Sequence, residues 1–189
     1  MMIDKNSARV KARNYRELLS VEDVAEYSER IADKVVALKE FIEAGTIYIY
    51  ASINNEVDTR YIVDAAMRMN KTVAFPRVTD ETLRFYRVDN PAELEFGYFG
   101  IQEPVENSDK LVDTDCGMII MPGVAFDRQF HRVGYGRGFY DRFLYEHDKL
   151  VKVAIAYEGQ FFDELETGEY DIAPDMIITE KNIYRRNNI

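Results

Sequence analysis

Three alternate glycines stand among arginines in residues 121–141, MPGVAFDRQFHRVGYGRGFYD. Gly134, Gly136 and Gly138 can adopt backbone conformations that other residues avoid, or admit a ligand close to the main chain. A helix that begins near Phe139 would point its first backbone N–H groups at an anion in this place. Arginine side chains favour the same ligand, because the guanidinium group matches the geometry of phosphate. The segment therefore predicts a phosphate-binding site.

The segment ends in Asp141, whose carboxylate is a hard oxygen ligand suited to Mg²⁺. Its glycine spacing, G-x-G-x-G, differs from both the P-loop pattern and the dinucleotide-binding fingerprint. The pattern therefore indicates a nucleotide-phosphate site of another kind. The alternative is a turn without a ligand, because glycine marks tight turns on steric grounds alone. In that case Asp141 would only be a favourable charge at the start of a helix.

The composition is typical of one globular enzyme domain over residues 1–189. The chain has a mass of 22.0 kDa, 47% hydrophobic residues and 31% charged residues, so it can bury a substantial core. No apolar run reaches the roughly 18 residues that a membrane span needs, and the polar N-terminus is unlike a signal peptide. The single Cys116 cannot form an internal disulfide, which favours a cytoplasmic location.

The net charge of −10 argues against a general nucleic-acid binder, because most of the surface would repel a phosphate backbone. Basic side chains nevertheless gather in one short segment, where they could concentrate positive potential for a small anion. They are Arg128, His131, Arg132, Arg137 and Arg142.

Helical and strand-like segments alternate along the chain. Hydrophobic spacing and capping residues predict helices at 5–18, 20–43, 59–69 and 139–147, the second opened by Ser20 with Asp23 at its third position. Runs of β-branched and aromatic residues predict strands at 46–50, 72–75, 83–88, 117–121, 151–156 and 176–179. This order predicts a three-layer α/β fold, a mainly parallel, Rossmann-like open sheet flanked by helices. Its ligand crevice would lie at the carboxyl ends of the strands.

Residues 121–141 resemble the signature of the 5-formyltetrahydrofolate cyclo-ligase family, also called methenyltetrahydrofolate synthetase. Further segments are similar to other motifs of that family and occur in the same order. They are 5–9 (KNSAR), 50–59 (YASINNEVDT), 75–77 (FPR), 97–104 (GYFGIQEP), 154–160 (AIAYEGQ) and 170–179 (YDIAPDMIIT). The resemblance thus covers nearly the whole chain.

The resemblance implies an ATP- and Mg²⁺-dependent ligase of one-carbon metabolism. Its reaction would convert 5-formyltetrahydrofolate to 5,10-methenyltetrahydrofolate with release of ADP and phosphate. The formyl oxygen is a poor leaving group, so it would first take the γ-phosphoryl group of ATP, after which N10 attacks the activated carbon. The implied partners are ATP and a folate that can carry a polyglutamate tail, bound by a monomer or a weak homodimer.

The resemblance also implies roles for particular residues. The ATP site would be formed by Lys5, Asn6, Ser7, Ala8, Arg9, Arg132, Val133, Gly134, Tyr135, Gly136, Arg137, Gly138, Phe139 and Tyr140. The folate site would comprise Tyr50, Ala51, Glu56, Phe99, Tyr135, Gly136, Arg137, Gly138, Phe139 and Tyr140. The implied catalytic residues are Lys5, Arg132 and Arg137, and the implied Mg²⁺ ligands are Asp141 and Asp175.

Local chemistry alone leaves other interpretations open. Lys5 and Arg9 could be solvated charges on a helix, and Tyr140 and Phe99 could be core residues. Phe130 stands where the family commonly has glycine, so a positive φ there would be strained. Two other functions compete with the ligase. One is a non-catalytic folate or nucleotide binder, and the other is a nucleotide-independent isomerase or acyl-transferase on a similar sheet.

Overall fold

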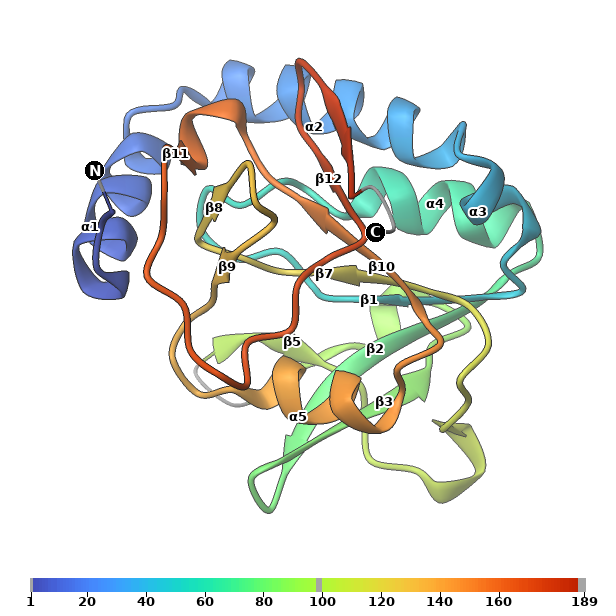
Figure 1. Cartoon of the computed structure of the whole chain (residues 1–189). Coiled ribbons are helices and arrows are strands. Elements are labelled where there is room, and N and C mark those ends of the chain that lie inside the picture. Colours follow the sequence, from blue (N-terminus) through green and yellow to red (C-terminus); the bar gives the residue numbers. More distant parts are fainter. Residues whose placement is uncertain (1, 98–99, 187–189) are drawn as a thin grey trace.

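An eight-stranded sheet runs through the protein, shown in Figure 1 as a computed structural model that describes residues 2–97 and 100–186. The strands follow the order β13-β12-β10-β7-β1-β2-β3-β6. They are β1 (Thr46–Ile49), β2 (Thr72–Thr79), β3 (Thr82–Arg87), β6 (Leu111–Val112), β7 (Met118–Met121), β10 (Val151–Ile155), β12 (Met176–Ile178) and β13 (Ile183–Arg185). The inner strands β12, β10, β7, β1 and β2 are parallel, and the others join antiparallel at the edges.

Helices cover both faces of this sheet. Three of them, α2 (Val21–Val36), α3 (Lys39–Glu43) and α4 (Arg60–Arg68), lie on one face, and α5 (Phe139–Glu146) lies on the other (Figure 1). The predicted three-layer, mainly parallel α/β fold is confirmed.

The pleat of the central strands divides the core into two layers. In β1, Ile47 and Ile49 belong to the cluster under α2 and α4, whereas Tyr48 joins the cluster under α5. All four residues of β7 are buried, as expected for a strand with helices on both faces. The expected apolar runs thus form the middle of the sheet.

The single helix expected at 20–43 is wrong, because the chain forms α2 and α3 instead. The start is as expected, since Ser20 and Asp23 form a reciprocal capping box. The helical run stops at Val36, and Leu38 has an extended backbone with ψ 138° while its side chain stays in the core. The spacing of apolar residues continues through the break between α2 and α3, so the sequence pattern could not reveal this break.

The sheet has a topological switch point between β1 and β7. The connection from β1 passes through α4 to β2 on one face, and the connection from β7 passes through α5 to β10 on the opposite face. The loops after the two adjacent strands therefore separate and leave a crevice at their carboxyl ends. Residues 50–59 and 122–138 form these loops.

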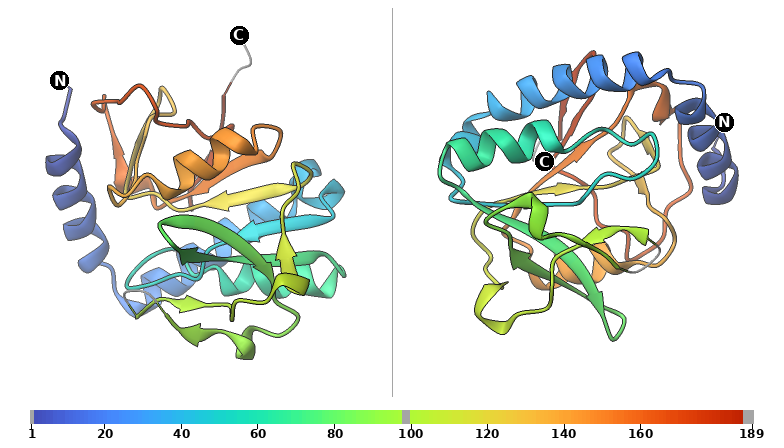
Figure 2. Two further views of the ribbon diagram at one scale, coloured as in Figure 1. Left: turned by 90° about the horizontal axis from the view of Figure 1, so that it is seen from below. Right: turned by 180° about the vertical axis from the view of Figure 1, so that it is seen from behind.

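Helix α1 (Lys5–Glu17) packs beside the end of the sheet, next to a small sheet formed by β8 (Ala125–Asp127), β9 (Arg132–Val133) and β11 (Phe161–Phe162). Figure 2 shows α1 at one side of the molecule, close to these strands. Its Ala8 and Ala12 are fully buried against Val124, Ala125 and Val133. Ile3 forms a β-bridge with Leu165, which ties the segment before α1 to the chain after β11.

No helix in the described ranges is long and apolar enough to cross a membrane. Two short strands, β4 (Glu95–Phe96) and β5 (Gln102–Glu103), form a separate antiparallel pair at the edge of the crevice.

Candidate active site

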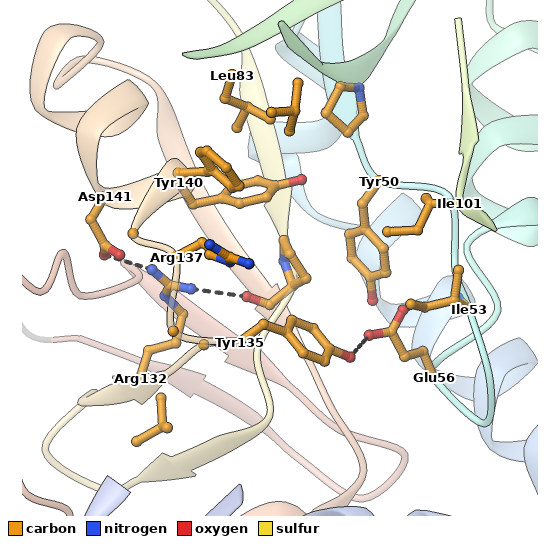
Figure 3. A pocket seen from close by; sticks show the side chains of 18 of the residues that line it. Tyr50, Ile53, Glu56, Leu83, Ile101, Arg132, Tyr135, Arg137, Tyr140 and Asp141 are labelled. Carbon is orange, nitrogen blue, oxygen red and sulfur yellow. Dashed lines mark hydrogen bonds and ion pairs between the residues drawn. The ribbon is translucent and has the colours of Figure 1, made fainter. Parts of the chain in front are cut away.

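A pocket of about 700 Å³ opens at the carboxyl ends of β1 and β7 (Figure 3). The loop after β1 contributes Tyr50, Ala51, Ile53 and Glu56, and β2 contributes Pro76 and Val78. The loop before α5 and the start of that helix contribute residues 132–141. The pocket thus lies where the sheet topology leaves the crevice, and it joins a charged half to an apolar and aromatic half.

Two ion pairs define the charged half. The Lys5 Nζ lies 2.5 Å from an Asp171 carboxylate oxygen, and the Arg132 guanidinium donates to Asp141 at 2.6 Å. Burial alone would raise the pKa of Asp171, but the Lys5 ammonium and the Gly168 N–H hold it below its ordinary value. The Lys5 and Asp171 side chains are 28% and 29% exposed. All four side chains line the pocket, and those of Lys5 and Asp171 are partly exposed there.

The glycine loop wraps around these charges. Gly136 and Gly138 have φ values of 99° and 65°, a region that favours glycine, and Gly138 is the residue before α5. A Cβ at Gly134 would lie 3.1 Å from the Arg132 guanidinium. Arg9 of α1 donates from its Nε to the Gly134 carbonyl at 2.8 Å, which fixes the loop against the helix. Arg137 also lines the pocket from an exposed position.

The turn before the glycine loop is organised by Asp127. This fully buried carboxylate accepts hydrogen bonds from the His131 ring and from the backbone N–H groups of Gln129, His131 and Leu165. Phe130 takes φ 67°, the left-handed conformation that a glycine would adopt without strain. The turn is therefore kept in the glycine geometry, and Phe130 is strained within it.

The apolar half is enclosed by side chains from β2, β3 and α5 and from the segments after β1 and before β5. Its walls are Tyr50, Pro76, Val78, Leu83, Ile101 and Tyr140 (Figure 3). The Tyr140 hydroxyl is buried and has no hydrogen-bond partner among the described residues. Burial also raises the pKa of Tyr50 and Tyr140 well above the ordinary value, so both hydroxyls stay neutral donors. A flat, polar-edged ring would find both stacking area and a free donor here.

Glu56 lies at the bottom of this half, and its side chain is only 5% exposed. Its Oε2 accepts the Ile53 N–H at 3.0 Å. Its Oε1 accepts from the Tyr135 hydroxyl, which reaches across from the glycine loop, and lies 3.4 Å from the Arg16 guanidinium. Burial raises the pKa of Glu56 above its ordinary value, against the opposing effects of Tyr135, Ile53 and Arg16. The site thus presents a buried acceptor to a ligand.

Most residues expected in the site line this pocket. They are Lys5, Arg9, Tyr50, Ala51, Glu56, Arg132, Val133, Gly134, Tyr135, Gly136, Arg137, Gly138, Phe139, Tyr140 and Asp141. Asn6, Ser7 and Ala8 do not: the first two donate their backbone N–H groups to Asp4, the cap of α1, and Ala8 is in the core. Phe99 lies outside the described residues.

The structure separates Asp175 from the pocket. Its carboxylate accepts the Lys152 N–H at 2.8 Å, and it directly precedes β12, so it lies at the amino end of a strand. The pocket lies at the opposite, carboxyl ends. Asp171, four residues earlier, lines the pocket together with Asp141 instead. Residue type alone could not show which of the two aspartates, Asp171 or Asp175, lies at the pocket. The start of β12 directly after Asp175 distinguishes them, because it places Asp175 at the amino end of that strand.

Sequence reasoning also missed Arg16. It is 5% exposed, and it contacts both Glu56 and Tyr135 from behind the pocket. The sequence pattern could have identified Arg16, because Lys5, Arg9 and Arg16 follow a helical spacing that places them on one face of α1. A third basic residue on that face indicates a charged partner rather than solvent.

A mainly parallel sheet with a glycine loop, two cation–carboxylate pairs and an aromatic wall at its switch point has the arrangement of a small-molecule site in an α/β protein. A sequence model of the 5-formyltetrahydrofolate cyclo-ligase family matches residues 1–180. The chain belongs to this family, and the resemblance drawn from the motifs is confirmed.

Relatives match along almost their whole length. The chain is 29% identical to the probable 5-formyltetrahydrofolate cyclo-ligase of Schizosaccharomyces pombe, covering 98% of this chain and 99% of that protein. It is 28% identical to the 5-formyltetrahydrofolate cyclo-ligase of Escherichia coli K12, covering 91% and 98%. The 5,10-methenyltetrahydrofolate synthetase of Aquifex aeolicus has a similar solved structure, with a TM-score of 0.86, 35% identity and coverage of 98% and 94%.

Proposed function

We propose that this protein converts 5-formyltetrahydrofolate to 5,10-methenyltetrahydrofolate, consuming ATP and releasing ADP and phosphate. The observation that carries the proposal is one pocket that joins two lysine- or arginine-carboxylate pairs to an aromatic chamber with a buried glutamate. A phosphate donor and a pterin could meet there. The family membership of the chain agrees with this chemistry.

The charged half would bind the phosphates of ATP. Lys5 and Arg132 now pair with aspartates, and phosphate oxygens would be equivalent partners for both cations. The backbone of residues 134–138 would supply N–H donors at the same place. Phosphoryl transfer depends on positioning and charge neutralisation, so Lys5, Arg132 and Arg137 are the proposed catalytic residues.

The carboxylates of the charged half fit Mg²⁺. Asp141 and Asp171 both line the pocket, and Mg²⁺ is commonly held by one or two carboxylates together with substrate phosphates. Bound there, Mg²⁺ would neutralise charge on the phosphate groups. We propose Asp141 and Asp171 as its ligands in place of the pair with Asp175.

The apolar half would bind the folate. A carboxylate in the position of Glu56 can accept two hydrogen bonds from the N–H groups of a pterin, and Tyr50 and Tyr140 would pack on its ring. The Tyr135 hydroxyl donates to Oε1 of Glu56, so a pterin that binds both carboxylate oxygens would replace it.

The reaction would proceed in two displacements. The formyl oxygen attacks the γ-phosphorus, and the bond from that phosphorus to ADP breaks. The N10 lone pair then attacks the formyl carbon, its proton leaves, and the carbon–oxygen bond breaks as phosphate departs. The chain's part is to hold the two substrates in line and to exclude water, which suits a pocket with apolar walls.

The test is the absorbance of the methenyl product after the purified protein is mixed with Mg²⁺, ATP and 5-formyltetrahydrofolate. We expect a rise that requires both ATP and Mg²⁺. Omission of ATP is the control for spontaneous cyclisation. Folate binding without any ATP-dependent product would instead identify a non-catalytic binder, and product without ATP would exclude the ligase mechanism.

Three finer properties of the protein and its substrate stay predictions. They are a polyglutamate tail on the folate, a monomeric or weakly dimeric state, and a cytoplasmic location. Sedimentation at several protein concentrations would test the oligomeric state.

A further inference from the structure

We propose that Arg16 is a positioning residue for folate, which acts through Glu56 and keeps that carboxylate oriented and ionised. The inference rests on the proposed function, because it takes Glu56 as the pterin acceptor. Arg16 does not line the pocket, so it has no direct contact with a ligand there. Its effect must pass through the groups that it touches.

The geometry places Arg16 directly behind the carboxylate. Its guanidinium lies 3.4 Å from the Glu56 Oε1 and 3.3 Å from the Tyr135 hydroxyl oxygen. The Arg16 side chain is 6% exposed and that of Glu56 is 5% exposed. Within the described part of the chain, no other cation forms an ion pair with Glu56.

The backbone on both sides of this pair is also held. The Asn55 side chain donates to the Arg16 carbonyl at 2.9 Å, and the Tyr157 hydroxyl donates to the Glu56 carbonyl at 3.0 Å. The Ile53 N–H fixes the second carboxylate oxygen. These contacts leave the Glu56 side chain one orientation, with the Tyr135 hydroxyl on its pocket side.

The charge of Arg16 matters because the other described groups that donate to the Glu56 carboxylate, the Tyr135 hydroxyl and the Ile53 N–H, are neutral near pH 7. Four phenols lie close enough to interact with the charge of Glu56, those of Tyr50, Tyr135, Tyr140 and Tyr157, and burial raises the pKa of each. An isolated carboxylate in such a place would take up a proton and lose acceptor capacity. A protonated Glu56 could no longer accept two hydrogen bonds from a pterin.

The experiment follows folate binding and Glu56 ionisation in Arg16→Gln and Arg16→Lys. We expect Arg16→Gln to raise the KM for 5-formyltetrahydrofolate by about tenfold at pH 6 and only slightly at pH 8, with little change in the KM for ATP. Arg16→Lys keeps the charge and should restore most of the binding at pH 6. An equal rise in KM at both pH values would overturn the proposal.

Arg13→Gln is the matched control. Arg13 is an exposed arginine on the same helix, and it lies over the Tyr135 ring, 5.7 Å from its centroid. It forms no ion pair with Glu56 in the described structure. This variant should leave the pH dependence of folate binding unchanged. The same pH-dependent loss in Arg13→Gln would point to the general charge of α1 and would overturn the role of Arg16.

The double variant Arg16→Gln/Glu56→Gln removes both charges, so no buried ion is left unpaired even if Arg16→Gln alone fails to fold. Its folate KM should equal that of Glu56→Gln, because Arg16 then has no carboxylate to act on. A further loss would show that Arg16 acts by another route and would overturn the proposal.

A readout without turnover separates this inference from the proposed function. With ¹³C at the glutamate carboxyl groups, the Glu56 resonance is the one that Glu56→Gln removes, and its titration gives the pKa directly. We expect Arg16→Gln to move the midpoint upward by about two pH units, the shift that a tenfold loss at pH 6 with little loss at pH 8 requires. An unchanged midpoint would overturn the inference, whereas absence of ATP-dependent product from the wild-type protein would overturn the proposed function alone.

Discussion

The two halves of the pocket contain the same chemistry, a cation beside a carboxylate, at different depths. The pair Lys5–Asp171 in the charged half has side chains 28% and 29% exposed, whereas those of Arg16–Glu56 are 6% and 5% exposed. Exposed pairs are weak, so a ligand can take either partner at little cost. A buried pair is expensive to break. The difference indicates that Lys5 and Asp171 can exchange partners on binding, while the Arg16–Glu56 pair of the aromatic half is preformed.

The largest effect is expected from Arg132→Ala, because Arg132 combines both properties. It is 7% exposed, yet it contacts Asp141 in the pocket. We expect kcat/KM to fall by about 10²- to 10³-fold, with the loss mainly in the use of ATP. Steady-state kinetics with each substrate varied would measure it. The control is Arg128→Ala, which removes an exposed arginine over the Tyr184 ring. Equal rises in both KM values would indicate a structural role.

Glu56→Gln tests the preformed half. The amide keeps the shape but supplies one acceptor oxygen, and it leaves Arg16 without its anionic partner. We expect the folate KM to rise by about tenfold to a hundredfold, with the ATP KM within a factor of about two. Glu17→Gln, an exposed change at the end of α1, is the control. An unaltered folate titration would remove Glu56 from the folate site.

Separate substitutions of Asp171 and Asp175 test which aspartate binds Mg²⁺ in the charged half. We expect Asp171→Asn to raise the Mg²⁺ concentration needed for half-maximal rate by about tenfold. Asp175→Asn should leave that concentration unchanged and instead lower the unfolding free energy by about 1–2 kcal/mol, since its carboxylate accepts the Lys152 N–H. Magnesium titrations and urea unfolding of both variants measure these effects. The reverse pattern would return Asp175 to the metal site.

The smallest effect concerns the turn that supports the charged half. Because Phe130 has φ 67°, we expect Phe130→Gly to be more stable than Phe130→Ala by about 1 kcal/mol, although glycine removes the Cβ. Urea unfolding of the two variants isolates the backbone term, since both lack the phenyl ring. Equal stabilities would mean that the turn rearranges, and Asp127 would then not hold it in this geometry.

Sequence patterns predicted the parts of the molecule that depend on local periodicity. The strands β1, β2, β3, β7, β10 and β12, the Ser20 cap and the start of α5 at Phe139 follow from spacing and residue type, and the structure confirms them. The short edge strands β6 and β13 were not predicted. The glycine-rich segment indicated the charged half because much of the pocket lining there, residues 132–141, is consecutive in the sequence.

The remaining features depend on contacts between distant segments. The strands β8, β9 and β11 are two or three residues long, too short for a periodic signal. The hydroxyl of Tyr135 reaches Glu56 across 79 positions of sequence, and Leu83 and Ile101 become pocket walls only through the packing of β3 and the β4–β5 pair. Helical spacing could have found Arg16, but not its partner.

The β-bridge between Ile3 and Leu165 determines when the region around Lys5 can reach its final structure during synthesis. Ile3 exchanges backbone hydrogen bonds with residues 164 and 166, and Lys5 meets Asp171, so opposite ends of the sequence meet beside the glycine loop. Such a long-range contact forms late in folding, because bringing its two partners together costs the conformational entropy of the chain segment between them. During translation Lys5 cannot contact Asp171 until residue 171 has left the ribosome. A nascent chain that stops earlier can form central strands but lacks the Lys5–Asp171 pair of the pocket.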